Sequence, residues 1–487
     1  MTVRSWLRWV AATAAFIGLP VLVGAVRLSE FDGGQLLRSA VPLPADDAVA
    51  VAPAHDPAKP TVAIILGADL TEITDALDPY EMFSRAGAFN VYTVAPEHRP
   101  TLLSGGLRIL PHYSLAQLDT RLGGVRPAIV VVPNIPNIAG VENRPLVEWM
   151  KRQAAAGSVM HSWCTGAMAL AEAGLLDGLT ATAHWGDLGR LTELYPRVEW
   201  VSGVRWVDHG QVITSAGLTS GIDASLRVLS RFAGEDLARR VARELHYPNF
   251  DFSKNPVVRP YTVGPADAIF PANLAFRVPR HQIGVALYDG VGEMDLTGLY
   301  DAHIASADLH SIASTSGGVR SAHGLILLPS LVASQSVDAG AISAFRSLDR
   351  FVVPGRNGVQ DAARVVGALR SLAPSLPPTY VQAAAGQRFA LEPVIEDLAR
   401  TTDLPTARFA LKRLEFRSET IRLEGNAIAW RTLPVALALG VFGALVALAL
   451  GRIFRSVRVL RNQSEEAIGE RGGVAASSSP VSGWGAP

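Results

Sequence analysis

The hydrophobic pattern divides the chain into two apolar ends and a long mixed body. An apolar run from Trp9 to Val26 follows two basic residues, Arg4 and Arg8. Such a run after a basic flank is typical of a signal peptide or signal anchor, predicted over residues 1–30. A second run, residues 432–451, carries no charge and has the ~20 residues that a helix needs to cross a bilayer. It is predicted to be a transmembrane helix, with a core helix as the alternative.

Basic residues on the outer sides of the two apolar runs predict an orientation. Four arginines follow the second run: Arg452, Arg455, Arg458 and Arg461. Because positive charge is retained on the cytoplasmic side, both ends of the chain are expected there and the body outside the cytoplasm. Residues 452–487 are predicted to form a cytoplasmic tail, largely disordered because Gly, Ser and Ala dominate its end. The expected location is therefore the cell membrane, with an extracytoplasmic body.

Inside the body, short apolar runs alternate with helix-like segments. After a predicted linker over 31–58, almost every position in the predicted strands is apolar. Strands of this kind occur in parallel sheets that helices cover on both faces, which predicts an α/β fold. Strands are expected at 61–66, 90–95 and 128–133, and helices at 79–86, 146–155 and 167–173.

The same pattern restarts near residue 281, which indicates an internal repeat of domain size. The run 283–288 matches the first strand, 348–354 matches 128–133, and the six-residue spacing of Asp69 and Asp75 returns at Asp289 and Asp295. Two tandem doubly wound domains are predicted, at 59–250 and 281–425, joined by a proline-rich linker at 251–280. The second copy is shorter and degenerate, and its residues 390–417 are expected to form one or two helices.

Charge and composition exclude several classes of function. The 487 residues carry 44 basic and 44 acidic side chains, so the chain lacks the basic surplus of nucleic-acid-binding proteins. A single cysteine excludes an intramolecular disulfide framework. No histidine, cysteine or acidic cluster has a metal-binding spacing, and His209 and His246 stand alone. No metal, cofactor or nucleic-acid partner is therefore predicted.

That single cysteine lies where a strand should turn into a helix. Cys164 stands between the apolar run that ends in His161-Ser162-Trp163 and the helix-forming stretch after Gly166. A strand, a sharp turn and a helix start are the parts of a nucleophile elbow, and a helix N-terminus lowers the pKa of a thiol. The alternative is a buried structural thiol, since free cysteine is among the most buried residue types.

Several motifs, taken together, resemble the ThiJ/PfpI superfamily, which has a flavodoxin-like, glutamine amidotransferase-like fold. The similarity is greatest to the amidase-like domains of AraC-type regulators and to the isocyanide hydratases. It covers about residues 60–245 and returns more weakly in the second copy. The matching stretches are Asp75–Phe83, Cys164–Ala167, Ala171–Gly178, Ala181–Trp185, Thr214–Gly217 and Gly221–Asp223, then Tyr288–Val291, Asp295–Gly298, Ser321–Gly324 and Val353–Gly355.

The resemblance implies a site built around Cys164. The family's acidic partner maps to Asp75, which would manage a proton beside the thiol or would instead cap the helix of Pro79. Glu72 is a weaker substitute. Thr165 would offer its hydroxyl and N–H group, and His184 would be either a base or a packing partner of Trp185.

Three departures from the family pattern bear on the chemistry. Thr165 stands where peptidase-like members have a histidine, which argues against proteolysis. Asn134 and Ile135 replace glycines whose N–H groups can stabilise an oxyanion. Trp163 is bulkier than usual and would narrow the pocket or pack in the core.

Two functions follow as expectations. The first is a membrane-anchored enzyme in which Cys164 attacks a small electrophile, in a hydratase-like or hydrolase-like reaction. The second is a non-catalytic module of the same fold that senses a ligand or oxidation. A DNA-binding regulator is not expected, since residues 400–416 are too short for the paired helix-turn-helix of the regulators. The two domains would pack as a pseudo-dimer, or the chain would form a homodimer.

Overall fold

The computed structural model describes residues 3–31, 52–248, 256–333, 339–383 and 386–473. It separates into two compact units, one containing Met1–Arg27 with Arg431–Pro487 and the other containing Leu28–Trp430. The first unit holds the terminal helices α1 (Val3–Phe31) and α17 (Leu433–Gly473). Each contains a stretch, Arg8–Ser29 and Leu433–Arg461, that is long and apolar enough to cross a membrane.

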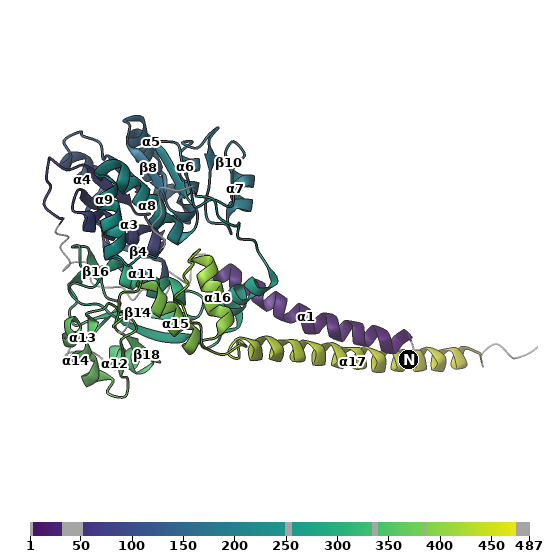
Figure 1. Cartoon of the computed structure of the whole chain (residues 1–487). Helices are drawn as coiled ribbons and strands as arrows, with labels where there is room; N and C mark the ends of the chain where they lie inside the picture. The colour runs from purple at the N-terminus through teal and green to yellow at the C-terminus, as the bar shows by residue number, and fades with distance from the viewer. Residues whose placement is uncertain (1–2, 32–51, 249–255, 334–338, 384–385, 474–487) are drawn as a thin grey trace, which may run out of the picture. The chain divides into compact units, whose positions relative to one another are not determined.

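The larger unit is a mixed α/β body with two mainly parallel sheets (Figure 1). The first sheet has seven strands, and all its pairings are parallel except that of its outermost strand. Their order is β11 (Trp206–Asp208), β12 (Val212–Ser215), β8 (Val159–Ser162), β7 (Ile129–Val132), β1 (Thr61–Ile65), β3 (Asn90–Ala95) and β6 (Tyr113–Ser114). Side chains alternate between the two faces of such strands. Ile64 therefore faces one core and Ile65 the other.

Helices cover both faces of this sheet. The core containing Ile64 lies under α3 (Ile73–Ala86) and α8 (Leu218–Ala233), and α9 (Glu235–Glu244) packs beside α8. The core containing Ile65 lies under α4 (Leu115–Arg121), α5 (Arg144–Ala155) and α6 (Ala167–Glu172). The remaining elements of this half are α7 (Leu188–Leu194), β9 (Thr180–Ala181) and β10 (Glu199–Trp200).

The second sheet lies in the C-terminal half of the body and has five parallel strands. Their order is β17 (Leu331–Val332), β14 (Ala307–Ala313), β13 (His281–Ala286), β18 (Arg350–Val352) and β19 (Pro378–Thr379). The helices of this half are α10 (Ile269–Phe276), α11 (Glu293–His303), α12 (Ala339–Arg346), α13 (Gly358–Asp361), α14 (Ala363–Leu372), α15 (Leu391–Thr401) and α16 (Leu404–Arg413).

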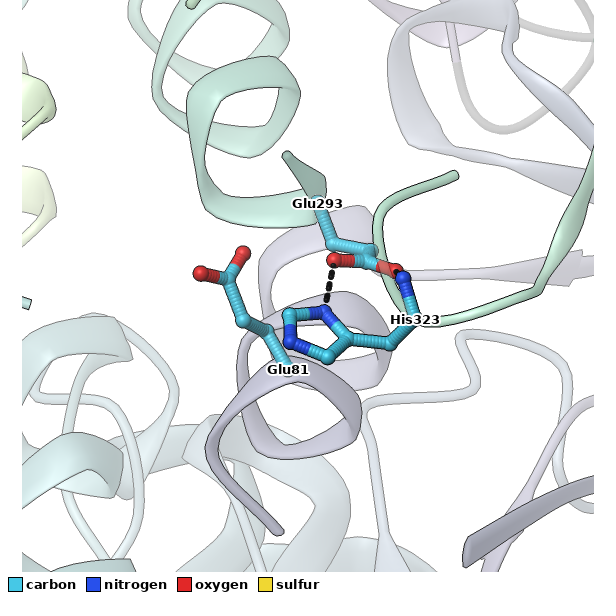
Figure 2. A group of neighbouring side chains, drawn as sticks. All are labelled: Glu81, Glu293 and His323. Atoms are coloured by element: carbon cyan, nitrogen blue, oxygen red, sulfur yellow. Dashed lines mark hydrogen bonds and ion pairs between the residues drawn. The ribbon is translucent and has the colours of Figure 1, made fainter. Parts of the chain in front are cut away.

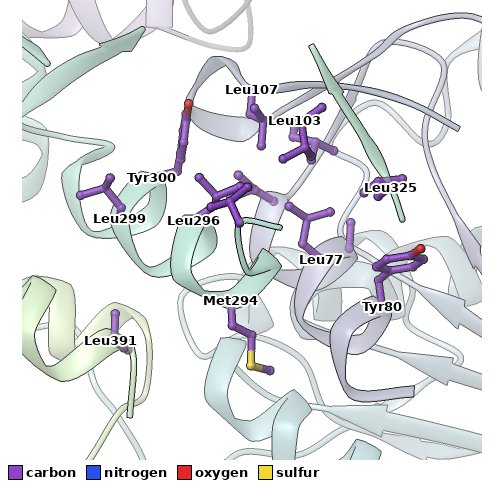
Figure 3. Close-up of a cluster of buried hydrophobic side chains, with 14 of the residues drawn as sticks. Leu77, Tyr80, Leu103, Leu107, Met294, Leu296, Leu299, Tyr300, Leu325 and Leu391 are labelled. Atoms are coloured by element: carbon purple, nitrogen blue, oxygen red, sulfur yellow. The ribbon is translucent and has the colours of Figure 1, made fainter. Parts of the chain in front are cut away.

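The two halves of the body share one buried interface. Helix α3 packs on α11, and Leu77 and Leu296 lie in one apolar cluster between them (Figure 3). A third sheet crosses the interface in the order β15 (Val319–Arg320), β16 (Ile326–Leu328), β5 (Arg108–Leu110), β4 (Thr101–Leu103) and β2 (Leu70–Thr71). In it, β5 and β16 pair antiparallel about Ile109 and Leu327. Hydrogen bonds and apolar packing both join the halves.

Several predicted elements are confirmed, and three need correction. The strands predicted at 61–66, 90–95 and 128–133 are β1, β3 and β7. The helix expected at 79–86 begins six residues earlier, at Ile73, because Pro79 sits inside the helix and not in its first turn. The expected linker at 251–280 contains α10, whose Phe270 packs on Phe409. The tail is helical to Gly473, since no proline interrupts its Glu- and Ala-containing stretch; residues 474–487 lie outside the described part.

Candidate functional site

The backbone at Cys164 has the sharp turn of a nucleophile elbow. Cys164 follows β8, and its φ of 53° lies in the left-handed region that side chains disfavour. Gly166 makes the turn possible, because a Cβ there would collide with the carbonyl oxygen of Val132. Trp163 stabilises the turn, because its buried indole donates a hydrogen bond to His161 Nε2 at 3.0 Å. The bulky Trp163 is therefore a core residue.

Asp75 lies in the first turn of α3 with its carboxyl fully buried. Its Oδ2 accepts a hydrogen bond from the Asn134 N–H at 3.0 Å, and Oδ1 has no partner among the described residues. Burial raises the pKa of Asp75 to about 8, against the opposing effect of the Asn134 bond. The N-cap of α3 is Glu72, so the alternative role of Asp75 as a helix cap is wrong. Asp75 holds a proton at neutral pH.

The thiol of Cys164 is almost closed off from solvent, at 5% exposure. Burial, and then the negative charges of Asp75 and Glu72, raise its pKa well above that of a free cysteine. The Thr165 N–H hydrogen bond to sulfur opposes this rise but does not outweigh it. The prediction that the helix start lowers the thiol pKa is therefore wrong, because α6 is only six residues long and burial, followed by the acidic neighbours, raises the thiol pKa.

Thr165 and His184 lie near the elbow but are held by other groups. The Thr165 hydroxyl donates to Asp187 Oδ2 at 2.6 Å and lies 3.9 Å from Cys164 Sγ. His184 Nδ1 accepts from the Gly186 N–H at 3.3 Å, so Nε2 carries the proton and donates to the Arg413 carbonyl at 3.0 Å. Burial lowers the pKa of His184, which is therefore neutral. Both of its ring nitrogens are engaged away from the thiol.

Two functional residues missed from the sequence come from the C-terminal half. Asp301 of α11 accepts a hydrogen bond from the Thr74 hydroxyl at the start of α3. Arg413, at the end of α16, donates to Asp301 Oδ1 at 2.8 Å and to the Asp301 carbonyl at 2.9 Å. Glu72 interacts with both, and its own pKa is raised by burial and by Asp301. More than 200 residues separate Asp75 from these groups, so no local motif could reveal them.

The turn after α16 closes the site from the same side. Glu415 has a left-handed φ of 51°, and its carboxylate accepts from the Ser220 hydroxyl at 2.7 Å. Its carbonyl accepts from the Thr219 hydroxyl at 3.0 Å. Gly217 is required here, since a Cβ would lie 2.5 Å from the Glu415 side chain. The C-terminal half thus places a guanidinium group beside Glu72 and packs a turn against the start of α8.

A second group of titratable residues lies at the interface of the halves (Figure 2). Glu81, Glu293 and His323 place their ligand atoms within 4.8 Å of one another, although no sequence spacing predicted a metal-binding cluster. His323 Nδ1 lies 2.7 Å from Glu293 Oε2, and this carboxylate raises the pKa of the imidazole. Glu81 is already bound by Arg85 and by the Met294 N–H. The arrangement is that of an ion-pair network joining α3 to α11.

Comparisons with known proteins agree with this geometry. The sequence profile described as the DJ-1/PfpI family matches residues 60–231. Isonitrile hydratase of Pseudomonas putida is 30% identical over 198 residues, which cover 39% of this chain and 80% of the hydratase. The HTH-type transcriptional regulator GbdR of Pseudomonas aeruginosa is 30% identical over 183 residues, 37% of this chain and 47% of the regulator. The chain thus spans about half the length of that relative.

A solved structure of a DJ-1 superfamily protein from Salmonella typhimurium is 23% identical and covers 39% of this chain and 100% of its own, with a TM-score of 0.35. The family profile matches the part of the chain that carries the elbow and Asp75. The expected resemblance to this family is thereby confirmed. The chain belongs to the DJ-1/PfpI family.

Proposed function

We propose that Cys164 and Asp75 form a hydratase-like site for a small uncharged electrophile, of which an isonitrile is the best-fitting class. The observation that carries the proposal is the buried Asp75 carboxyl, which retains a proton at neutral pH beside the thiol. The strained backbone of Cys164 adds support, because strain of this kind gathers at functional residues. The relation to an isonitrile hydratase points to the same chemistry.

An isonitrile suits this site because its terminal carbon takes up a nucleophile and a proton together. The thiol sulfur bonds to that carbon while Asp75 gives the carbon its proton and receives the S–H proton, which yields a thioimidate R–N=CH–S–Cys. Water then adds to the same carbon, a proton passes to nitrogen, and the C–S bond breaks to give R–NH–CHO and the free thiol. Isonitrile and water are consumed and one formamide forms.

Hydration of an isonitrile does not require free N–H donors for an oxyanion in its first step. Acyl transfer develops charge on an oxygen and needs N–H donors directed at that oxygen. Here the Asn134 N–H already binds Asp75, so one such donor is occupied. Addition to an isonitrile carbon creates no oxyanion in its first step. The occupied N–H therefore favours hydratase-like chemistry over hydrolysis of amides or peptides.

The test is turnover of cyclohexyl isonitrile by the full chain in detergent, followed as cyclohexylformamide by chromatography. Cys164→Ser and Asp75→Asn should each reduce the rate by about 100-fold or more, as expected for loss of a nucleophile or a general acid. Asp69→Asn, which removes an exposed carboxylate six residues before Asp75, is the matched control and should retain the rate. Undiminished turnover by Cys164→Ser would refute the proposal.

Ligand sensing without turnover is the second function, and one observation favours it. The thiol at the elbow is only 5% exposed, which suits ligand-controlled opening better than rapid substrate exchange. Oxidation sensing fits less well, because redox-sensing thiols have low pKa values and are accessible. Saturable binding of the isonitrile with no formamide formed would favour sensing over catalysis.

We also infer that α1 and α17 anchor the protein in a membrane, with the body on the extracytoplasmic side. The two helices pack antiparallel, with Gly440 against Phe16 and Gly443 against Ala15, and such small residues allow close approach of membrane helices. The arginines beyond α17 support a cytoplasmic tail.

The orientation can be tested by labelling intact cells with a membrane-impermeant maleimide, in a Cys164→Ser background. Glu419→Cys, before α17, should react in intact cells. Ser464→Cys, beyond the apolar stretch, should react only after lysis. The reverse pattern would refute the proposed orientation.

Finally, we propose that the C-terminal half is a degenerate repeat of the first and packs on it as a covalent pseudo-dimer. Corresponding elements meet at the interface: α3 packs on α11, and β5 pairs with β16. Polar contacts also correspond, since Glu81 of α3 accepts from the start of α11 while Asp301 of α11 accepts from the start of α3. In each contact, a carboxylate of one half accepts a hydrogen bond from the first turn of a helix in the other half.

A further inference from the structure

A cavity of about 310 Å³ lies between the two halves of the body, and Cys164 is not in its lining. Its wall includes Tyr288, which follows β13, and Gly355, which follows β18. The N-terminal half contributes to the same wall through Arg85 of α3 and His246 after α9. The cavity is therefore built by both halves, at the carboxyl ends of parallel strands, where α/β folds place their ligands.

In the proposed repeat, strand register places this cavity where the first half has the cysteine site. Val131 pairs with His161 in the first sheet, and Val352 pairs with Thr379 in the second. Counting three residues onward from each partner reaches Cys164 in the first half and Gln382 in the second. Asp295 stands in the second half where Asp75 stands in the first, six residues after its preceding aspartate.

Gln382 fills the place of the nucleophile with a side chain that cannot attack. It is 1% exposed, and its Oε1 accepts from the Gly355 N–H at 2.6 Å. Its Nε2 donates to the Asp295 carbonyl at 3.1 Å and to the Ala390 carbonyl at 3.2 Å. All three of these hydrogen bonds join the Gln382 amide to backbone groups. The second site is built to bind and not to react.

Each site receives a helix-ending turn from the other half. His246 after α9 has a φ of 56°, and Glu415 after α16 has a φ of 51°. The hydrogen bonds around them match, since Leu245 N–H donates to Val241 and Leu414 N–H donates to Ala410. Yet Glu415 bonds to Ser220 at the cysteine site, whereas His246 lines an open cavity.

The charged side chains in the cavity wall indicate which charge a ligand would carry. Its wall carries four carboxylates, Glu81, Glu244, Asp295 and Asp361, and two guanidinium groups, Arg85 and Arg356. Arg85 is paired with Glu81, and Glu244 is paired with Arg240 outside the cavity.

Arg356 donates to the carbonyls of Gly386 and Arg388, which fixes its position. Asp295 differs from these groups, because no hydrogen bond to its carboxylate is found within the described residues. Two glycines leave room beside it: a Cβ at Gly292 would lie 2.6 Å from Oδ2, and a Cβ at Gly355 would lie 3.3 Å away.

We propose that this cavity binds a small organic cation, with the Asp295 carboxylate as its counter-ion and the rings of Tyr288 and Phe389 in its wall. The Tyr288 hydroxyl already donates to the Pro354 carbonyl at 2.6 Å, so the ring and not the hydroxyl is offered to a ligand. Aromatic rings and a carboxylate together are a common way to hold an ammonium group. The volume suits a molecule of modest size.

The test is isothermal titration of the full chain in detergent with butylammonium, and with butyrate and butanol as the anionic and neutral probes of the same length. Butylammonium should bind, with butyrate and butanol at least tenfold weaker. Asp295→Asn should weaken butylammonium binding at least tenfold, while the exposed control Asp69→Asn should leave it unchanged.

Gly292→Ala is a second variant, since its φ of −67° tolerates alanine while the added methyl group crowds the carboxylate. It should also weaken binding. Equal binding of butylammonium by Asp295→Asn, or tighter binding of butyrate, would overturn the proposal. The site is independent of the cysteine chemistry, so isonitrile turnover should be the same in Asp295→Asn and in the unmodified chain.

Discussion

The left-handed backbone at Cys164 makes a quantitative prediction about stability. A residue with a Cβ pays ~1–2 kcal/mol in this region, and glycine does not. Cys164→Ala and Cys164→Gly both remove the thiol, so the loss of buried sulfur is common to both. Their difference in unfolding free energy therefore depends on the strain of the elbow, at a residue whose φ is 53°, and on the backbone entropy of glycine.

The expected difference follows from two opposing terms. Replacing alanine by glycine relieves the ~1–2 kcal/mol of left-handed strain. It also adds the larger conformational entropy that glycine loses on folding, about 0.5–1 kcal/mol. Cys164→Gly should therefore be more stable than Cys164→Ala by about 0.5–1 kcal/mol. Glycine normally destabilises, so the sign alone is informative.

The assay is thermal unfolding of both variants in the same detergent, monitored by tryptophan fluorescence. For a body of this size the difference corresponds to a shift in Tm of about 1–2 °C. Ala167→Gly is the matched control, because Ala167 has an ordinary helical φ of −57° three residues away and should be destabilised by glycine. If Cys164→Gly were no more stable than Cys164→Ala, the elbow would not be strained and the reasoning would fail.

Three further predictions concern the surroundings of the thiol. Asp75→Asn should accelerate alkylation of the Cys164 thiol by iodoacetamide at pH 9, because the ionised Asp75 carboxylate otherwise raises the thiol pKa. At pH 6 the Asp75 carboxyl is already neutral, so the acceleration should be much smaller. Equal alkylation rates of the two proteins at pH 9, measured by mass spectrometry, would contradict this. Arg413→Met should destabilise the protein by about 3–5 kcal/mol because it strands the buried carboxylate of Asp301, and Asp301→Asn in the same chain should recover part of the loss of Tm. Gly221→Ala should cost about 1–3 kcal/mol, since its methyl group would overlap the indole before the cysteine, whereas Gly189→Ala meets open space and should leave the Tm unchanged.

Local sequence was enough to predict the scaffold of the first half. The strands β1, β3 and β7 are short apolar runs, and a run of that kind can bury both faces only inside a covered parallel sheet. The elbow was predictable for a similar reason, because a small glycine-containing turn between a strand and a helix-forming stretch leaves few backbone alternatives. The sequence also predicted a repeat, since the spacing of two aspartates returns with the apolar runs.

Sequence by itself therefore determined the α/β class and the position of Cys164 at a strand end, and the resemblance to the family predicted Asp75 as its acidic partner. Tertiary structure alone decided the chemistry around them. Asp301 and Arg413 act on the Asp75 carboxyl from a half whose elements lie more than 200 residues away, and their contacts depend on the packing of α3 on α11. The direction of the thiol pKa shift was likewise a tertiary property, because burial and charge at a point depend on every chain segment that meets there, and not on the neighbours along the sequence.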